Sequence, residues 1–413
     1  MSTETPAAQA LWEGALSAAG AQITGSAIRE LLKLTEQPEF ISFAGGLPAP
    51  ECFPAEEIGL ASERVLAEHA ARALQYGPTE GFPPLRELLA DLMLARGIGV
   101  SSDEVLVTSG SQQALDLLGK LLIDQGSVVL VEEPTYVGAL QAFRPYGPRF
   151  VSVPMDDSGL LPEALERTLG DLAATGVRPA FLYTVATFQN PTGVTLSAER
   201  RAALLDIAER HELRVVEDDP YGELRYSGEP LAPLAALDVR RHSAPHHVVY
   251  LSTFSKLLAP GLRVGWAAGP RPLLRRMALA KQGVDLHTGS LAQAVAYESC
   301  REGLLERQIP RIRSIYGERR DTMLRALERT MPAGVRWTRP EGGMFLWLTL
   351  PEGVDSTALL ARAIERKVAF VPGASFHANG GGARTMRLNF SYAPPARIEE
   401  GVARLAEALR AGE

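Results

Sequence analysis

The stretch Val248-Val-Tyr-Leu-Ser-Thr-Phe-Ser-Lys256 decides the fold of this 413-residue chain. Its first four residues form a short apolar run of β-branched, aromatic and aliphatic side chains, which is typical of a buried strand. Hydroxyl side chains and a lysine follow directly after this run. In open α/β sheets, ligands bind just beyond the carboxyl ends of the strands. Lys256 is therefore a candidate functional residue.

Four other short apolar runs alternate with segments of helical spacing. Two such segments are Gln112–Ile123 and Ala198–His211, in which apolar residues recur on one face. Buried strands that alternate with amphipathic helices predict βαβ units and a mainly parallel sheet, hence an α/β fold. The four runs are Val105–Thr108, Val128–Val131, Phe181–Val185 and Val215–Val216.

The C-terminal part of the chain has a different pattern. Gly343–Leu350 and Met386–Tyr392 indicate longer strands, Ala396–Leu409 indicates a closing helix, and a long helical stretch covers about Leu304–Thr330. We expect a smaller α+β domain here. The predicted organisation is an N-terminal arm (residues 1–50) that packs with the small domain, a large α/β domain (51–320) and the small domain (321–413).

The composition excludes several classes of function. Hydrophobic residues make up 46% and charged residues 22%, as in a globular protein with a large core. The net charge of −7 argues against nucleic acid or an acidic membrane as a partner. The longest uncharged run, 179–198, is broken by polar residues, glycine and proline, so no transmembrane segment is expected. Only two cysteines occur and the first basic residue is Arg29, so we expect no signal peptide and a cytoplasmic protein.

Each of the five predicted strands is followed by polar groups. Because the carboxyl ends of parallel strands meet at one edge of a sheet, these groups predict a single site. The five segments are Ser109-Gly-Ser-Gln-Gln113, Glu132-Glu-Pro-Thr-Tyr136, Gln189-Asn-Pro-Thr-Gly193, Glu217-Asp-Asp-Pro-Tyr221 and Ser252-Thr-Phe-Ser-Lys256.

The first and last of these segments suit a phosphate and an amine nucleophile. Gly110-Ser-Gln112 at a helix start offers backbone and side-chain donors to an anion, although Ser is also an ordinary helix cap. No nucleotide-binding motif occurs, so a phosphate-bearing cofactor other than a nucleotide fits better. Lysine can act as an amine nucleophile, and Arg263 offers a second phosphate contact. The alternative for Lys256 is an ordinary surface lysine.

The remaining segments suit an aromatic cofactor. Asp218 follows a buried strand, where a carboxylate needs a partner such as a pyridinium nitrogen. Asn190 and Tyr221 could hydrogen-bond a phenolate oxygen. Tyr136 could stack on a ring, or it could be a core tyrosine.

These residues together carry a resemblance to a known family. Asn190-Pro-Thr-Gly193, Asp218-x-x-Tyr221 and Ser255-Lys256 with Arg263 resemble the signature of class I/II pyridoxal-phosphate aminotransferases of fold type I. The chain is most similar to the 2-aminoadipate and kynurenine aminotransferase group. The stretches that carry this closer likeness are Ser26–Lys33, Ile41–Pro50, Gln75–Gly81, Gly110–Ala114, Asp285–Thr288, Gly342–Phe345 and Met386-Arg387.

The resemblance implies a large domain with a mainly parallel seven-stranded sheet that binds pyridoxal 5'-phosphate, and it implies roles for individual residues. Lys256 would bind the cofactor as an internal aldimine, with Asp218 and Tyr136 as the other catalytic residues. Arg387, Asn190 and Gly46 would bind the substrate α-carboxylate, and Arg29 a side-chain carboxylate. The implied cofactor-binding residues are Tyr76, Gly110, Ser111, Gln112, Tyr136, Asn190, Asp218, Tyr221, Thr253, Ser255, Lys256 and Arg263.

The resemblance also implies the reaction and the assembly. We expect ping-pong transfer of an amino group from an L-amino acid (2-aminoadipate, glutamate, leucine or an aromatic amino acid) to a 2-oxo acid such as 2-oxoglutarate, as in lysine biosynthesis and other amino-acid metabolism. A homodimer is expected, in which Tyr76 reaches the partner's site. The open alternatives are an enzyme specialised for aromatic or branched amino acids or kynurenine, a lyase on the same fold, and a non-catalytic regulatory domain.

No metal site is expected. His246 and His247 are adjacent, so we expect their side chains not to present side by side, and no HExxH or Cys/His ligand spacing occurs.

Overall fold

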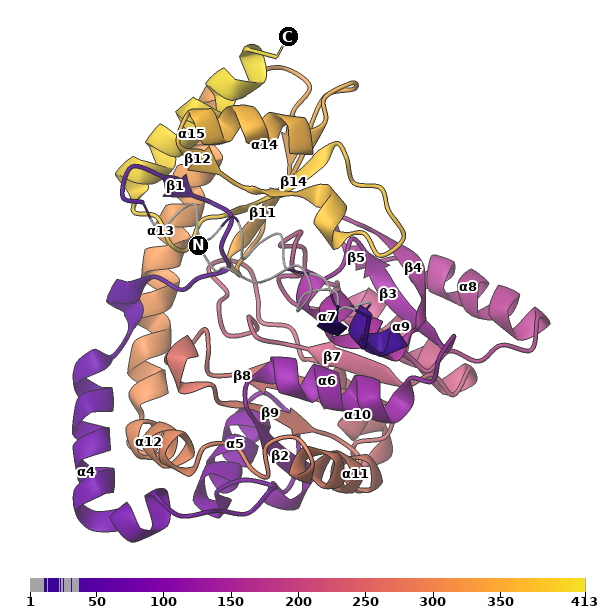
Figure 1. The fold of residues 1–413 in the computed structure, drawn as a ribbon, viewed down its shortest axis with the longest axis vertical. Helices are drawn as coiled ribbons and strands as arrows, with labels where there is room; N and C mark the ends of the chain where they lie inside the picture. The colour runs from indigo at the N-terminus through magenta and orange to yellow at the C-terminus, as the bar shows by residue number, and fades with distance from the viewer. Residues whose placement is uncertain are drawn as a thin grey trace.

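The computed structural model describes residues 11–412 except 13, 22, 24, 26–30 and 32–36. Its larger part is built on one central sheet (Figure 1). The order of strands in this sheet is β2 (Val105–Thr108), β9 (Gly265–Ala268), β8 (Val248–Thr253), β7 (Val215–Asp218), β6 (Phe181–Thr184), β3 (Val128–Glu133), β4 (Arg149–Asp156) and β5 (Gly159–Leu160).

The direction of the strands confirms the predicted α/β fold. Strands β8, β7, β6, β3 and β4 pair in parallel, whereas β9 is antiparallel to both β2 and β8. The sheet therefore has the seven expected strands plus the two-residue β5, which pairs only with the end of β4.

Besides the two-residue β5, two strands of this sheet were not predicted from the sequence. Strand β4 has partly exposed residues along most of its length, so it lacks a continuous apolar run. Strand β9 is only four residues long and consists mostly of small residues.

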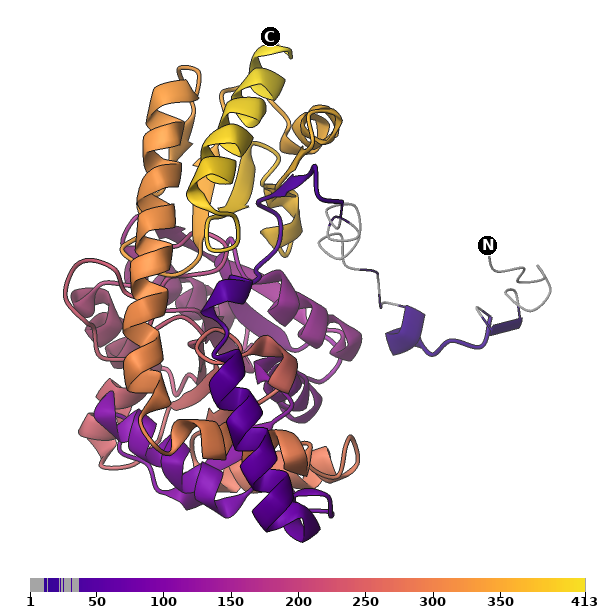
Figure 2. The same ribbon diagram turned by 90° about the vertical axis from the view of Figure 1, so that its left-hand side faces the viewer.

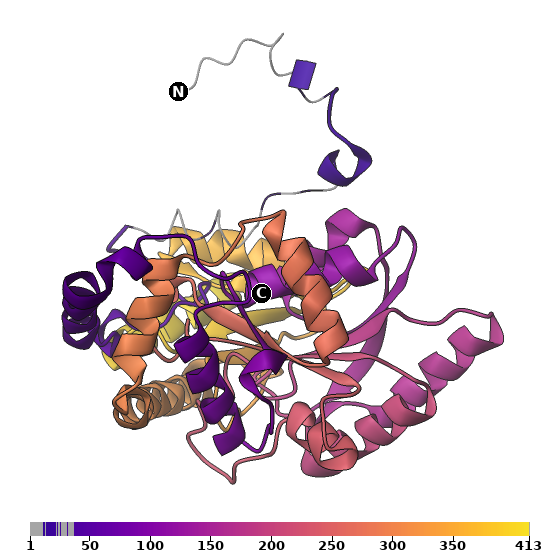
Figure 3. The ribbon, with the colours of Figure 1, turned by 90° about the horizontal axis from the view of Figure 1, so that it is seen from below.

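Helices cover both faces of this sheet, as Figure 3 shows from below. Helices α6 (Ser111–Leu122), α7 (Val137–Phe143) and α11 (Arg271–Gln282) lie on one face, and α8 (Pro162–Ala174), α9 (Ala198–Arg210) and α10 (Leu234–His242) on the other. Helices α4 (Ala55–Ala73), α5 (Pro83–Ala95) and α12 (Ser290–Cys300) complete this part. Their amphipathic sequences explain the packing, as in α6, where Leu115 and Leu118 are fully buried.

A smaller part lies above the large sheet in Figure 1. Its antiparallel sheet has the order β10 (Arg336–Trp337), β11 (Phe345–Thr349), β14 (Thr385–Asn389) and β13 (Val371–Pro372). Strand β1 (Ile41–Ser42) pairs in parallel with β12 (Val368–Ala369), which ties the segment before residue 50 to this part. Helices α14 (Ser356–Glu365) and α15 (Pro395–Arg410) pack beside these strands.

Helix α13 (Leu304–Thr330) has the bounds expected from the sequence and runs beside both parts (Figure 2). It passes residue 320 without a break, and the division of the chain at residues 50 and 320 stays a prediction. Cys52 and Cys300 are free and buried. Among the described helices, none combines the length and the apolar character that a bilayer crossing needs.

Candidate active site

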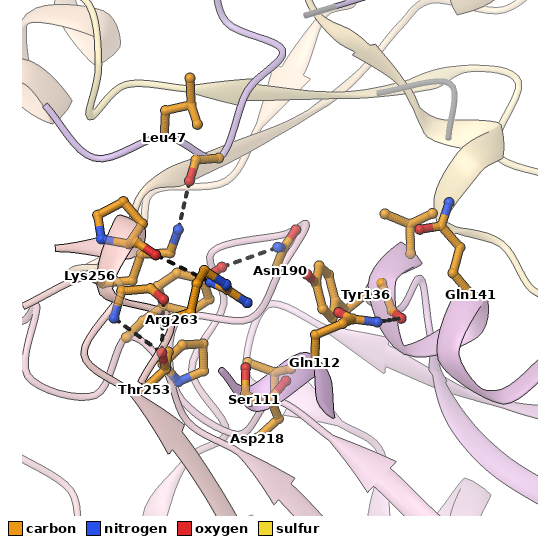
Figure 4. A pocket seen from close by; sticks show the side chains of 18 of the residues that line it. Leu47, Ser111, Gln112, Tyr136, Gln141, Asn190, Asp218, Thr253, Lys256 and Arg263 are labelled. Carbon is orange, nitrogen blue, oxygen red and sulfur yellow. Dashed lines mark hydrogen bonds between the residues drawn. The ribbon is translucent and has the colours of Figure 1, made fainter. Parts of the chain in front are cut away.

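A cavity of about 1040 Å³ opens between the carboxyl ends of the large sheet and the smaller part (Figure 4). The structure brings together most of the residues that the sequence singles out. Those that line the cavity are Gly46, Ser111, Gln112, Tyr136, Asn190, Asp218, Tyr221, Thr253, Ser255, Lys256, Arg263 and Arg387.

Three predicted residues are not in this lining. Gly110 is buried directly behind it, as the residue before α6. Tyr76 follows α4 and is 78% exposed, away from the cavity of its own chain. Arg29 lies outside the described residues, so its predicted contact with a side-chain carboxylate stays a prediction.

Lys256 lies three residues after the end of β8 and reaches into the cavity. Its Nζ donates a hydrogen bond to the carbonyl oxygen of Gly46, at 2.7 Å. Burial, together with the positive charges of Arg387 and Arg263, lowers the pKa of the Lys256 amine to about 8. An amine that loses its proton near neutral pH can act as a nucleophile and as a general base.

Asp218 is the last residue of β7 and is buried below the cavity. Its Oδ2 accepts a hydrogen bond of 2.9 Å from the hydroxyl of Tyr183, but its Oδ1 has no partner in the described part of the chain. Burial raises the pKa of Asp218 to about 7. A buried carboxylate oxygen without a partner is costly, so this position suits a ligand that donates a charged N–H.

Tyr183 is a residue that sequence reasoning missed. It lies within an apolar run on β6, where it resembles an ordinary core residue, and β6 pairs directly with β7. The sequence offered one signal of its role, namely its hydroxyl group, because a tyrosine buried in a strand usually has a hydrogen-bond partner.

An anion cradle forms where α6 begins. Gly110 has a φ of +80°, and a Cβ there would lie 2.4 Å from Nη2 of Arg263. A Cβ on Gly265 would lie 2.7 Å from the backbone nitrogen of Ser111. The glycines therefore let the helix N-terminus and a guanidinium approach each other, which is the combination that binds phosphate.

Hydroxyl and amide groups complete this cradle. The hydroxyls of Thr253 and Ser255 lie 2.8 Å apart at the cavity wall. Gln112, at the start of α6, donates its side-chain N–H to the carbonyl oxygen of Gly138, at 2.7 Å. It therefore connects the start of α6 to the start of α7.

A partly buried network that the sequence did not reveal supports the cradle from behind. Oδ2 of Asp285 accepts hydrogen bonds from Ser109 Oγ at 3.0 Å and from Gln113 Nε2 at 2.7 Å. Nζ of Lys281, whose side chain is fully buried, lies 2.7 Å from the same oxygen. The residues on both sides of Gly110-Ser111-Gln112 are thus anchored to one carboxylate.

Tyr136 and Asn190 both line the cavity (Figure 4). The ring of Tyr136 passes over Gly138, where a Cβ would come within 2.4 Å of the ring. Nδ2 of Asn190 donates to the hydroxyl of Tyr221 at 3.2 Å. These groups can contact the face and the edge of a bound ring, as the sequence predicts for Tyr136, Asn190 and Tyr221.

Arg387 on β14 is only 2% exposed, yet it faces the cavity. Its Nη1 donates to Oδ1 of Asn190 at 2.8 Å, and its Nη2 to the carbonyl oxygen of Ala44 at 2.7 Å. The guanidinium lies over the ring of Phe345, 4.2 Å from the centroid. Burial lowers its pKa to about 10, and within the described residues it forms no ion pair with a carboxylate. A carboxylate ligand is therefore the natural partner of Arg387.

The outer wall adds residues that the sequence analysis did not select. Leu47, Val137, Gln141 and Arg144 line the cavity above Tyr136. Arg144 is exposed and has no ion pair with a described carboxylate, so its charge is available to a ligand.

The residues of the cavity fit pyridoxal phosphate. The cradle suits its phosphate, the unpartnered oxygen of Asp218 suits its ring nitrogen, and Lys256 suits its aldehyde carbon. Arg387 lines the same cavity and remains available to bind the carboxylate of an amino acid.

Known proteins support the same conclusion. A profile of the family described as aminotransferase class I and II matches residues 47–405. The chain is 51% identical over 386 residues to the aromatic-amino-acid aminotransferase 1 of Thermococcus litoralis, covering 93% of this chain and 91% of the relative. It is 48% identical over 399 residues to the 2-aminoadipate transaminase of Thermus thermophilus, covering 97% of each.

A solved structure gives the same result for the fold. The crystal structure of Pyrococcus horikoshii kynurenine aminotransferase, in complex with PMP, superposes with a TM-score of 0.93 at 48% identity and covers 97% of this chain and 98% of that chain. The chain therefore belongs to the family of class I and II aminotransferases, and it is an enzyme that transfers amino groups with pyridoxal phosphate as its cofactor.

Proposed function

We propose that Lys256 is the residue that binds pyridoxal phosphate covalently and moves the proton at the substrate Cα. The observation that carries this proposal is the position of Lys256, whose Nζ reaches into the same cavity that Asp218 and Arg387 line. Lys281 is a described lysine with a fully buried side chain, but its amine is paired with Asp285.

The remaining residues position the reactants. The cradle of Ser111, Thr253, Ser255 and Arg263 holds the phosphate, and Asp218, supported by Tyr183, holds the ring N–H. When bound, pyridoxal phosphate supplies a ring that withdraws electrons and stabilises negative charge at Cα. Lys256 then takes a proton from Cα and returns one, as general base and general acid.

Arg387 sets the orientation of the substrate. Its guanidinium binds the α-carboxylate, with Asn190 beside it, and the stacking on Phe345 fixes its plane. A carboxylate held in this way stays attached while the proton moves, which favours amino transfer over a decarboxylating lyase reaction.

For the substrate side chain, we place a second carboxylate at the outer wall, near Gln141 and Arg144. The proposed donor is 2-aminoadipate or glutamate, with 2-oxoglutarate as the acceptor, as the name of the Thermus relative suggests. Arg29 is proposed as a further partner of this carboxylate.

An aromatic amino acid is the second candidate donor. Two observations favour it: the Thermococcus relative is named for aromatic amino acids, and the apolar residues Leu47 and Val137 also line the outer wall. Both donors need the same Arg387 and differ only in their contacts with the outer wall.

We further propose a homodimer in the cytoplasm. Leu74, Tyr76, Leu286 and Leu291 are exposed near a hollow between α4 and α12, and a second copy would cover them. Tyr76 would then reach the phosphate in the partner's cavity. Light scattering of the purified protein at several concentrations tests the assembly, and a monomer would contradict it.

A single half-reaction tests the proposed donor. Purified protein with bound cofactor is mixed with L-2-aminoadipate in the absence of any 2-oxo acid, and the cofactor absorbance is followed. Conversion to the pyridoxamine form supports a dicarboxylic donor. No conversion with 2-aminoadipate, but conversion with phenylalanine or kynurenine, would replace the dicarboxylic donor with the aromatic one.

A further inference from the structure

Three histidines gather at the end of the large sheet opposite the cavity. His242 is the last residue of α10, and His246 and His247 directly precede β8. One ring nitrogen from each lies within 4.8 Å of the others. Lys256 follows the other end of β8, so the two sites lie at opposite ends of this strand.

This arrangement corrects the expectation for His246 and His247. Their rings lie side by side, with centroids 4.5 Å apart, and the ring of His242 stacks on that of His246 at 4.4 Å. The cause is the chain reversal after α10, where Ser243 has a φ of +61°. Adjacent side chains are kept apart only in an extended chain, in which neighbouring side chains point to opposite sides.

A buried carboxylate holds this loop in place. Asp238 is fully buried, and its Oδ2 accepts hydrogen bonds from the backbone N–H groups of His246 at 2.8 Å, His247 at 3.1 Å and Val248 at 3.2 Å. Oδ1 of the same carboxylate lies 3.9 Å from Nε2 of His242. The backbone of His246 and His247 is therefore anchored to a side chain of α10.

The ring of His247 has the polarity that a metal ligand needs. Nδ1 of His247 lies 3.1 Å from the carbonyl oxygen of Leu213, and a carbonyl can only accept, so Nδ1 carries the proton. The lone pair of His247 is then on Nε2, and a hydrogen bond of this kind commonly orients histidine ligands. The side chain of His246 is exposed and has no hydrogen bond to any described residue.

We propose that His242, His246 and His247 bind one Zn²⁺ ion, with water as the fourth ligand. Imidazole nitrogen suits Zn²⁺, Ni²⁺ and Cu²⁺, and three histidines with one water form a common zinc geometry. Tetrahedral coordination needs nitrogens about 3.3 Å apart. The present separations are within 4.8 Å, so the rings turn about their side-chain bonds to reach that value. Through these ligands, the ion links the end of α10 to the start of β8.

The test uses untagged holoenzyme, because a histidine tag would bind the same ions. Zn²⁺ binding is measured by calorimetry and by elemental analysis after dialysis, and Co²⁺ replaces Zn²⁺ to record a ligand-field spectrum. We expect one ion per chain, a higher melting temperature with Zn²⁺, and an unchanged cofactor absorption band.

Variants assign the ligands. His246→Gln and His242→Gln should each weaken Zn²⁺ binding by at least about tenfold and abolish the melting shift. The matched control is His211→Gln, a half-buried histidine at the end of the neighbouring helix α9 that pairs with Glu166, and it should bind Zn²⁺ like the unmodified enzyme. The proposal would be overturned if the unmodified enzyme did not bind Zn²⁺. It would also be overturned if the variants His242→Gln and His246→Gln bound Zn²⁺ as tightly as the unmodified enzyme.

Discussion

The hydroxyl of Tyr183 donates a hydrogen bond of 2.9 Å to Oδ2 of Asp218 and leaves Oδ1 of the same carboxylate free towards the cavity. One oxygen of Asp218 is thus used for positioning, and the other remains for the cofactor. This division rests on two adjacent strands, β6 and β7, whose register brings the two side chains together.

Tyr183→Phe should lower kcat/KM by about 10- to 100-fold. A hydrogen bond to a charged group contributes about 1.5–3 kcal/mol, and this bond favours the ionised form of Asp218. Its loss raises the pKa of Asp218, so the acid limb of the kcat/KM profile should move to higher pH. Tyr146→Phe, which removes a bond of the same kind to Asp116, is the control and should leave the profile unchanged. An unshifted acid limb in the Tyr183 variant would refute the role of Tyr183.

Asp218→Asn should make the apoenzyme more stable above pH 7. The folded pKa of Asp218 is raised to about 7, so between about pH 4 and 7 the folded state binds a proton that the unfolded state has lost. Stability of the wild-type apoenzyme therefore falls as pH rises through this window, by on the order of a few kcal/mol. The free energy of unfolding of the wild-type and variant apoenzymes is measured by urea denaturation at pH 5 and pH 8. If the stability of the variant depends on pH as that of the wild type does, Asp218 is not the source of this pH dependence.

Gly265→Ala should weaken cofactor binding by an order of magnitude or more. The added Cβ would lie 2.7 Å from backbone atoms of Gly110 and Ser111, so the start of α6 must move away from the phosphate. The control is Gly261→Ala, because a Cβ there meets nothing within 4 Å. Cofactor affinity is measured by titration of the apoenzyme. Equal affinities for the two variants would argue against the cradle as the phosphate site.

Lys256→Ala should abolish amino transfer and the covalent attachment of the cofactor. Borohydride reduction followed by peptide mass spectrometry should find the cofactor on Lys256 in the wild type and on no peptide of the variant. Lys120→Ala, an exposed lysine on α6, should behave as the wild type. Wild-type turnover by the Lys256 variant would remove Lys256 from the mechanism.

Arg144→Ala should lower kcat/KM for 2-aminoadipate by about 10- to 100-fold and leave kcat/KM for leucine unchanged. A charge-assisted hydrogen bond to the distal carboxylate contributes about 1.5–3 kcal/mol, and leucine has no such carboxylate. Arg167→Ala, on the exposed side of α8, controls for the loss of a surface charge. Equal losses for both substrates would show that Arg144 does not select the side chain.

Much of the fold could be predicted because it depends on local patterns. The apolar runs of β2, β3, β6, β7 and β8 and the periodicity of α13 appear in single stretches of sequence. The order of polar groups after the strands also identified ten of the residues that line the cavity, because parallel strands present their carboxyl ends at one edge. The resemblance to a family then assigned roles that the residues alone left open.

Other features depend on contacts between distant segments. Arg387 meets Asn190 across 197 positions, and Tyr183 meets Asp218 through strand register, so no local pattern shows either pair. The anchoring of Ser109 by Asp285 arises in the same way. The clustering of His242 with His246 and His247 is local and arises from the chain reversal at Ser243. Residue type and periodicity thus determine which elements form and which groups lie at strand ends. Side-chain pairing, burial and the resulting pKa shifts are decided only when the packed elements exclude water and bring those groups together.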